Sequence, residues 1–366
     1  MRIAAVSQIR PGSSRAHAIN AIKTAGGFAR LGHEVTFFSQ PFETPDPACE
    51  YHEHELRWVT APPFTSGADP DEQFGRWAAE QIRRGGYEFV YARNFWAPLL
   101  LAEWGIPVVI ETHAYVGAVN PLLDRSLQAT RRHTSLRAII TIAPILREHF
   151  IARGADPDRV CVVPDGVDFE LLTCPTSSPY GNPGPHITYA GHLYDYKGIP
   201  TILEAAAELP GRQFHLVGGL PCDIDRTRTR IEALGLRNLT LHGRVAHAKV
   251  PAFVQHADVL LLPPSGREAS KDWTSPVKLG EYLATGVPIA ASAIPALRRV
   301  LCEPMVRFFE PDDPSSLARA IECCLSEPAD SPSRAARIAH ARSLSYRARA
   351  ARILEAAALG AGERAA

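Results

Sequence analysis

The sequence predicts two doubly wound α/β domains, each with a parallel sheet covered by helices on both faces. Three observations support this prediction. Short apolar runs without polar alternation are separated by longer amphipathic stretches, which is typical of strands buried on both faces of a parallel sheet. This alternation stops once, in a stretch dense in Pro, Ser and Gly, and then starts again. The length of 366 residues also exceeds one ordinary core, so two domains are the expected organisation.

The expected elements follow the apolar runs in order. In the first half, we expect strands at 2–6, 33–39, 88–92, 107–111, 138–142 and 159–163, with helices near 15–31 and over 144–154. In the second half, we expect strands at 186–191, 213–219, 239–243, 258–264, 287–292 and 306–310. The chain is therefore divided into a first domain over 1–170, a linker over 171–185, a second domain over 186–345 and a helical tail over 346–366. Sheets of this kind bind ligands beyond the carboxyl ends of their strands.

Composition excludes several classes of protein. Lys and Arg number 39, as do Asp and Glu, and no basic tract appears, which argues against a nucleic-acid partner. The seven cysteines form no C-x-x-C pair, so we expect neither a disulfide framework nor a zinc site. Free cysteines of this kind indicate a protein of a reducing compartment. The N-terminal apolar stretch is too short for a signal peptide, and no run approaches the roughly 18 residues of a membrane span. We expect a cytoplasmic protein, for which weak peripheral membrane contact remains open.

The stretch "TSPVKLGEYLATGVPIAAS" (274–292) carries the first candidate site. Ser275 is a good N-cap, Pro276 suits the first turn, and Gly286 is where a helix should stop, which predicts a helix over 276–285. Lys278 and Glu281 then share one face, and the free N–H groups beside Thr274 and Ser275 form an anion site. A phosphate at the helix end and a diol deeper down would describe a nucleotide. A capped helix with a surface ion pair explains the same spacing equally well.

A second candidate site lies in "YAGHLYDYKGIPTILEAAAELP" (189–210). A strand ends at Gly191, a short loop carries His192 and Lys197, and a helix follows Gly198. Glycine lets the backbone approach a ligand closely, and Lys197 at a helix mouth would be a second phosphate partner. The alternative is an exposed lysine on a tight turn, which is common.

Two further stretches follow strands of the first domain. In "PVVIETHAYVG" (107–117), His113 lies just beyond the carboxyl end of a buried strand, a position that favours a functional role over the more frequent structural one. In "VVPDGVDFELL" (162–172), Asp165-Gly166 is interpreted as a structural turn.

Taken together, these stretches resemble the retaining glycosyltransferases of family four, which have the GT-B fold. The matching pieces cover nearly the whole chain and lie mostly in its second half: "VVPDGVD", "YAGHLYDYKG", "HLVGG", "LTLHGRV", "HADVLLLPP" and "SPVKLGEYLATGVPIAAS". Each piece alone is weak, but six in register are specific for the superfamily and not for a substrate.

The resemblance implies a nucleotide-sugar donor, with a uridine base favoured over guanosine, and no metal or other cofactor. Glu281 resembles the ribose-binding glutamate, Lys197 the lysine on the diphosphate, and His113 the first-domain histidine that approaches the donor sugar. The resemblance also implies a group of donor-binding positions, namely Gly12 in the loop over the reaction centre, Gly191 and His192 in the diphosphate loop, Arg244 and Val245 near the base, and Thr274, Ser275, Pro276, Val277 and Lys278 at the phosphates. The implied role is in the biosynthesis of a glycan or glycoconjugate.

The sequence also departs from the family pattern. The family commonly pairs two glutamates with seven residues between them, and here Trp273 occupies the first position. Glu268 and Asp272 are the nearby carboxylates that could reach the sugar hydroxyls. His192 stands where the family often has arginine, and "RPGSS" replaces the usual paired glycines after the first strand.

Other functions remain open at this point. A nucleotide-sugar epimerase or a phosphorylase could use the same architecture, and Trp273 gives some weight to a non-catalytic nucleotide-sugar-binding subunit. A dehydrogenase is disfavoured because no G-x-G-x-x-G follows the first strand. The acceptor is not determined by the sequence, and 91–96 and 115–121 are only candidate contacts with it.

Overall fold

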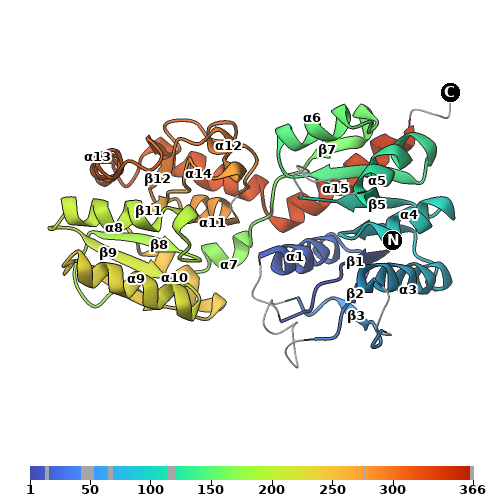
Figure 1. The fold of residues 1–366 in the computed structure, drawn as a ribbon, viewed down its shortest axis with the longest axis horizontal. Coiled ribbons are helices and arrows are strands. Elements are labelled where there is room, and N and C mark those ends of the chain that lie inside the picture. Colours follow the sequence, from blue (N-terminus) through green and yellow to red (C-terminus); the bar gives the residue numbers. More distant parts are fainter. Residues whose placement is uncertain (13–15, 43–52, 65–68, 114–120, 276, 363–366) are drawn as a thin grey trace. The chain divides into compact units, whose positions relative to one another are not determined.

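The computed structural model describes residues 1–12, 16–42, 53–64, 69–113, 121–275 and 277–362 (Figure 1). The chain splits into two compact units. The first comprises Met1–Gly166 together with Leu344–Ala366, and the second comprises Val167–Ser343. Each unit has its own parallel sheet, so the predicted architecture of two doubly wound α/β domains is confirmed.

The sheet of the first unit has, within the described residues, seven parallel strands in the order β3-β2-β1-β4-β5-β6-β7. The strands are β1 (Arg2–Val6), β2 (Glu34–Ser39), β3 (Arg57–Thr60), β4 (Phe89–Ala92), β5 (Val108–Glu111), β6 (Leu136–Thr141) and β7 (Val160–Val162). The central strands β4 and β5 are wholly buried, which explains why they appear as unbroken apolar runs. The sequence did not predict β3, because this edge strand is short, half exposed and without such a run.

Helices cover both faces of this first sheet. They are α1 (Ala16–Arg30), α3 (Pro70–Gly85), α4 (Trp96–Glu103), α5 (Pro121–Arg132), α6 (Pro144–Ala152), the 3₁₀ turn η1 (Pro157–Arg159) and α15 (Tyr346–Gly362). Phe37 of β2 belongs to the core shared with α1 and α15, whereas its neighbour Phe38 packs edge-on against Trp77 of α3. Successive strand residues point to opposite faces of a sheet. Helices α1 and α15 therefore lie on one face, and α3 lies on the other.

The second unit repeats the design with six parallel strands within the described residues, in the order β10-β9-β8-β11-β12-β13. The strands are β8 (His186–Ala190), β9 (Gln213–Val217), β10 (Leu239–Gly243), β11 (Val259–Leu262), β12 (Ile289–Ser292) and β13 (Arg307–Phe309). All six were predicted, because each is an apolar run bounded by Gly, Pro or charged residues. The order changes direction at β8 and β11, and ligands in open α/β sheets bind where the strand order reverses.

The helices of the second unit begin close to the ends of these strands. They are α7 (Phe169–Thr173), η2 (Asp195–Lys197), α8 (Ile199–Glu208), α9 (Pro221–Ala233), η3 (His247–Lys249), α10 (Val250–Gln255), η4 (Ala269–Asp272), α11 (Val277–Thr285), α12 (Pro295–Arg298), α13 (Pro314–Leu325) and α14 (Pro332–Ser343). The helix predicted over 276–285 is α11, with Pro276 outside the described residues. It ends as predicted at Gly286, whose φ of 72° suits glycine.

The stretch 171–185, predicted to be a linker, lies inside the second unit. Tyr180 anchors it there: its ring stacks on His186 with centroids 4.0 Å apart, and its hydroxyl donates to the Phe253 carbonyl over 2.7 Å. The chain instead passes between the units at 166/167 and 343/344. The sequence-based boundaries are corrected accordingly, because Pro, Ser and Gly do not prevent a segment from packing.

The predicted tail is also part of a unit, since α15 (red in Figure 1) completes the core of the first one. Ala350 and Ile353 belong to the same apolar cluster as Phe28 of α1. The two helices approach closely at Gly27, where a Cβ would lie 2.3 Å from the Tyr346 carbonyl oxygen. The core of the first unit is therefore built from segments far apart in the sequence.

None of the helices among the described residues is both long and apolar enough to cross a membrane.

Candidate active site

His113 lies directly beyond β5 in the first unit, as the sequence predicted. Its Nε2 is 2.7 Å from Oε1 of Glu111, the last residue of that strand. An ionised carboxylate can only accept, so the Nε2 of His113 carries the proton of this hydrogen bond. In the neutral imidazole, Nδ1 is then the acceptor. The strand end thus fixes both the ring and its tautomer.

Glu111 is itself held by three side chains at the base of the first unit's site. Its Oε2 accepts from an Arg349 guanidinium N–H and from the Tyr91 hydroxyl, each over 2.7 Å, and Arg93 Nε lies 3.6 Å from Oε1. Burial alone would raise the pKa of Glu111, but Arg349 and Arg93, together with the bond from His113, outweigh it and hold the pKa well below its usual range. Glu111 is therefore a permanent anion.

Arg349 is a site residue that sequence reasoning missed. It lies on α15 and is only 1% exposed. Besides Glu111, its guanidinium donates to the Thr24 hydroxyl over 2.9 Å and to the Pro164 carbonyl over 2.9 Å. No local signal marks it, because it is one of several arginines in an Ala-rich helix.

Asp165, interpreted as a turn residue, also faces His113. Its Oδ1 lies 3.7 Å from His113 Nε2 and accepts from the Asn20 amide over 2.7 Å. Glu111, His113 and Asp165 thus present possible ligand atoms within 4.8 Å of one another. Both oxygens of Glu111 already accept hydrogen bonds from protein groups, so we interpret the group as an ion-pair network.

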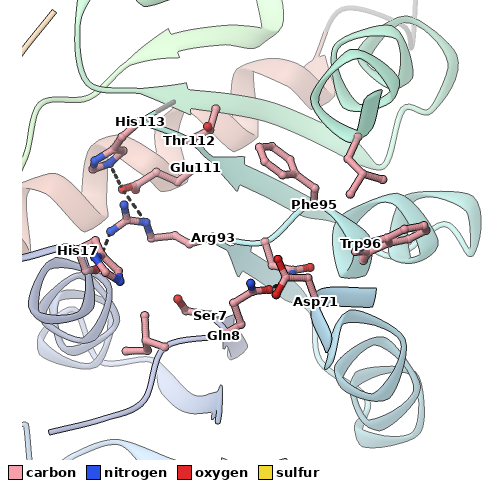
Figure 2. A pocket seen from close by; sticks show the side chains of 13 residues that line it. Ser7, Gln8, His17, Asp71, Arg93, Phe95, Trp96, Glu111, Thr112 and His113 are labelled. Carbon is pink, nitrogen blue, oxygen red and sulfur yellow. Dashed lines mark hydrogen bonds and ion pairs between the residues drawn. The ribbon is translucent and has the colours of Figure 1, made fainter. Parts of the chain in front are cut away.

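A pocket of about 510 Å³ opens beside this network (Figure 2). His113, Glu111 and Arg93 lie on one side of it, with Phe95 and Trp96 on the other. The remaining lining residues are Ser7, Gln8, Ile9, His17, Asp71, Asn94, Thr112 and Leu122. The volume lies in the range of small-molecule sites.

Gly12 also belongs to the first unit and lies in the loop that follows β1. Its φ is 94°, a conformation that favours glycine. The residues that follow it, 13–15, lie outside the described part of the chain, as do 114–120, which hold most of the candidate acceptor contact 115–121.

The remaining predicted site residues lie in the second unit, and Lys278 is central among them. Its ammonium donates to the Tyr189 hydroxyl over 2.6 Å and lies 3.8 Å from the centre of that ring. Burial lowers the pKa of Lys278 well below its usual value, and the positive charge of Lys197 lowers it further, against an opposing effect of Glu281. The two lysines therefore occupy one electrostatic environment.

Lys197 ends the short turn η2, directly before α8. Burial also lowers the pKa of Lys197, and Glu268 opposes this effect. The next residue, Gly198, has a φ of 82°, and a Cβ there would lie 1.8 Å from the Pro263 carbonyl oxygen. Only glycine allows this close passage of two backbones, which fixes the position of Lys197. Among the described residues, no carboxylate forms an ion pair within 4.0 Å of either lysine.

The loop after β8 brings Gly191 and His192 to the same place. A Cβ on Gly191 would lie 2.3 Å from Lys278 Nζ, so the glycine makes room for the ammonium. Burial lowers the pKa of His192, and the positive charges of Lys278, Lys197 and Arg244 add to this effect. The buried Nδ1 of His192 has no hydrogen-bond partner among the described residues. Positive charge with an unpaired polar atom is an environment that an anion would stabilise.

Glu281 follows Lys278 by three residues on the same helix, α11. Burial raises its pKa, opposed by His247 and Lys278, while Asp168 adds to the increase. Thr274, Ser275 and Val277 are partly buried at the start of this helix, and Pro276 lies outside the described residues. Val245 follows Arg244 after β10, and no described contact ties it to the cluster.

Trp273, which occupies the position of the family's first glutamate, follows η4 directly. Of the two carboxylates named as substitutes, Glu268 raises the pKa of Lys197, whereas no such effect is described for Asp272. Glu268 also lines a second pocket of about 410 Å³ together with Tyr196 and Ser265. The structure thus distinguishes two residues that the sequence could not.

Comparison with known proteins extends over both units. The family model described as Glycosyltransferase Family 4 matches residues 21–171, and that described as Glycosyl transferases group 1 matches residues 184–327. A D-inositol 3-phosphate glycosyltransferase of Pseudarthrobacter chlorophenolicus is 27% identical over 342 residues, covering 80% of this chain and 78% of that protein. One of Xylanimonas cellulosilytica is 26% identical over 339 residues, covering 80% and 79%.

Two solved structures have a similar fold. A glycosyltransferase from Rickettsia africae matches with a TM-score of 0.78 at 16% identity, covering 99% of each chain. Anabaena Alr3699/HepE in complex with UDP matches with a TM-score of 0.71 at 17% identity, covering 97% of this chain and 99% of that one.

Proposed function

This chain belongs to the family 4 glycosyltransferases of the GT-B fold, and we propose that it transfers a sugar from a nucleoside diphosphate sugar to an acceptor hydroxyl with retention of anomeric configuration. One observation carries this proposal: Lys278, whose ammonium lies against Gly191, is close enough to Lys197 for that charge to lower its pKa, and no described carboxylate forms an ion pair within 4.0 Å of either lysine. A diphosphate would supply the missing negative charge.

The donor-binding roles follow from the positions in the second unit. Lys197 and Lys278 bind the diphosphate, together with the backbone N–H groups at the start of α11. Glu281, one turn deeper, accepts hydrogen bonds from the ribose hydroxyls. Arg244 and Val245 lie near the base, after the Gly243 turn that ends β10.

Uridine is the favoured base of the donor. The Anabaena structure with a similar fold holds UDP, which supports this choice at the level of the fold. Guanosine is the alternative base, and the panel of nucleoside diphosphates described below distinguishes the two.

In the proposed reaction, the bond between the anomeric carbon and the diphosphate oxygen breaks. The acceptor oxygen bonds to the same face of that carbon, and its proton leaves with the diphosphate. Lys197 and Lys278 stabilise the charge that develops on the leaving group, as preorganised cations do, so we propose no metal requirement. His113, with its ring fixed by Glu111, accepts a hydrogen bond through Nδ1 from a hydroxyl of the acceptor.

The test is the thermal unfolding of wild type and Glu281→Ala with a panel of nucleoside diphosphates and their sugars. A ligand at about a hundred times its dissociation constant stabilises the protein by about 2.7 kcal/mol. We expect one nucleotide to raise the unfolding temperature of wild type and to lose that effect in the variant. If no nucleotide raises the unfolding temperature of wild type, the proposal is wrong.

A further inference from the structure

The pocket lined by His113 in the first unit indicates which class of acceptor it can bind. Resting on the proposed function, we propose that this pocket binds an uncharged, polyhydroxylated acceptor, a sugar or cyclitol, and discriminates against a phosphorylated one. The relatives named above are, by name, transferases to a phosphate-bearing acceptor, so the inference separates this chain from them.

The cationic side chain that lines the pocket is already engaged. Arg93 donates to the His17 carbonyl over 2.9 Å, and its Nε lies 3.6 Å from Glu111. Arg349 adds a second positive charge to Glu111, and Asp165 adds a second negative one, so the network has no net charge when His113 is neutral. The base of the pocket therefore offers no unpaired positive charge for a phosphate.

Two further guanidiniums lie near the pocket but outside its lining. Arg76 and Arg125 lie over the Trp96 ring, at 5.6 and 5.8 Å from its centre. Arg76 is also paired with Glu72 over 2.7 Å. Neither residue lines the cavity, and each guanidinium interacts with the indole ring.

The uncommitted groups of the lining suit hydroxyls. The Oδ1 of Asn94 accepts from the Ala97 N–H in the first turn of α4 over 2.9 Å, so its amide N–H₂ must face Gln8. That contact, 2.6 Å to Gln8 Oε1, leaves the Gln8 amide N–H₂ as a donor to a ligand. His113 Nδ1 is the matching acceptor. A sugar hydroxyl can both donate and accept, whereas a phosphate dianion cannot donate to the imidazole.

The rim adds a negative charge. Asp71, in the first turn of α3, lines the pocket, and within the described residues its carboxylate has no ion pair. A free carboxylate accepts hydrogen bonds from adjacent hydroxyls of a ring and repels a phosphate. Phe95 and Trp96 supply the apolar surface that the C–H faces of such a ring require.

The experiment uses the full-length protein, its donor with a labelled sugar, and an array of immobilised glycans and cyclitols, each present as a neutral and a phosphorylated form. We expect label on neutral members, at least tenfold above their phosphorylated counterparts. Asp71→Asn should raise KM for a neutral acceptor about tenfold at little change in kcat, and reduce the discrimination against phosphate. Glu103→Gln, an exposed acid-to-amide change at the end of α4, should leave both unchanged.

Label at equal or higher level on phosphorylated members would overturn the inference. So would the absence of label on all neutral members while the donor still binds, and in that case the donor site of the proposed function stands. If wild type binds no nucleotide-sugar donor, the proposed function itself is wrong, and this result is distinct from the other two.

Discussion

The charged groups of the two units are arranged in opposite ways. In the first unit, Glu111 is buried among Arg349, Arg93 and His113, so the charges of this network are paired with one another. In the second unit, Lys197 and Lys278 are brought together with Arg244 nearby, and the described residues supply no close counterion. One set of charges is complete within the protein, and the other is not.

The difference separates two uses of charge. A paired buried network holds side chains in place, since removal of one partner leaves an uncompensated charge. An unpaired cationic cluster lowers its own pKa values and reserves its charge for a ligand. We therefore assign positioning to the network of the first unit and anion binding to the cluster of the second. The predictions below test this assignment, beginning with the largest effect.

Arg349→Ala should reduce the free energy of unfolding by about 3–5 kcal/mol, because it leaves Glu111 buried beside a single arginine. Arg349→Ala combined with Glu111→Gln should be less destabilised than Arg349→Ala alone, because the unpaired charge is gone. The measurement is denaturant unfolding followed by circular dichroism.

Arg352→Ala is the matched control for this prediction. Arg352 lies on the same helix, in an exposed position, and makes one long bond of 3.2 Å to the Val162 carbonyl. Its loss should change stability by less than about 1 kcal/mol. Equal effects of the two alanine variants would mean that α15 needs bulk there and not charge.

Lys197→Ala should leave the fold intact and lower kcat at saturating donor by about 100- to 1000-fold, equivalent to about 2.7–4 kcal/mol in the barrier. The reason is that the leaving diphosphate loses a preorganised cation. Release of nucleotide is the quantity to measure, with the unfolding temperature of the free variant as the check on folding.

Lys249→Ala, an exposed lysine at the end of η3, provides the comparison for nonspecific loss of positive charge. It should retain wild-type turnover. Turnover of Lys197→Ala that equals that of wild type at saturating donor would show that the assignment of Lys197 is wrong.

Much of this fold could be predicted because buried parallel strands are unbroken apolar runs. Twelve of the strands were located in this way, and β3 was missed because an exposed edge has no such run. The units were harder to delimit. Tyr180 packs a Pro- and Gly-rich stretch onto β8, and α15 returns to the first sheet, and neither contact has a local signal.

The same division holds for the site. The proximity of Lys197 and Lys278 was predictable because each lies at a strand end or helix mouth, and parallel strands bring such positions to one edge of the sheet. Arg349 was not, because its partner Glu111 is 238 residues away in the sequence. Tyr189, which receives the Lys278 hydrogen bond, was hidden inside a strand that looked like ordinary core.

Donor affinity should fall as pH rises through the lowered pKa of Lys278, and this is the smallest of the expected effects. Burial and the charge of Lys197 lower the pKa of Lys278, so in the free protein it loses its proton at a lower pH than an exposed lysine. A bound diphosphate favours the charged form. Binding therefore takes up a proton, and the dissociation constant rises up to tenfold for each pH unit above that pKa.

The two lysines should be coupled in this titration. Lys197→Ala removes the like charge, so the pKa of Lys278 rises and the loss of affinity moves to higher pH, whereas Lys249→Ala leaves it in place. Calorimetric titration with a nucleotide sugar, in buffers of different ionisation enthalpy, measures both the affinity and the proton uptake. If the pH dependence were the same in Lys197→Ala as in wild type, the lysines would be electrostatically independent. The contrast between a paired and an unpaired site would then rest on the first unit alone.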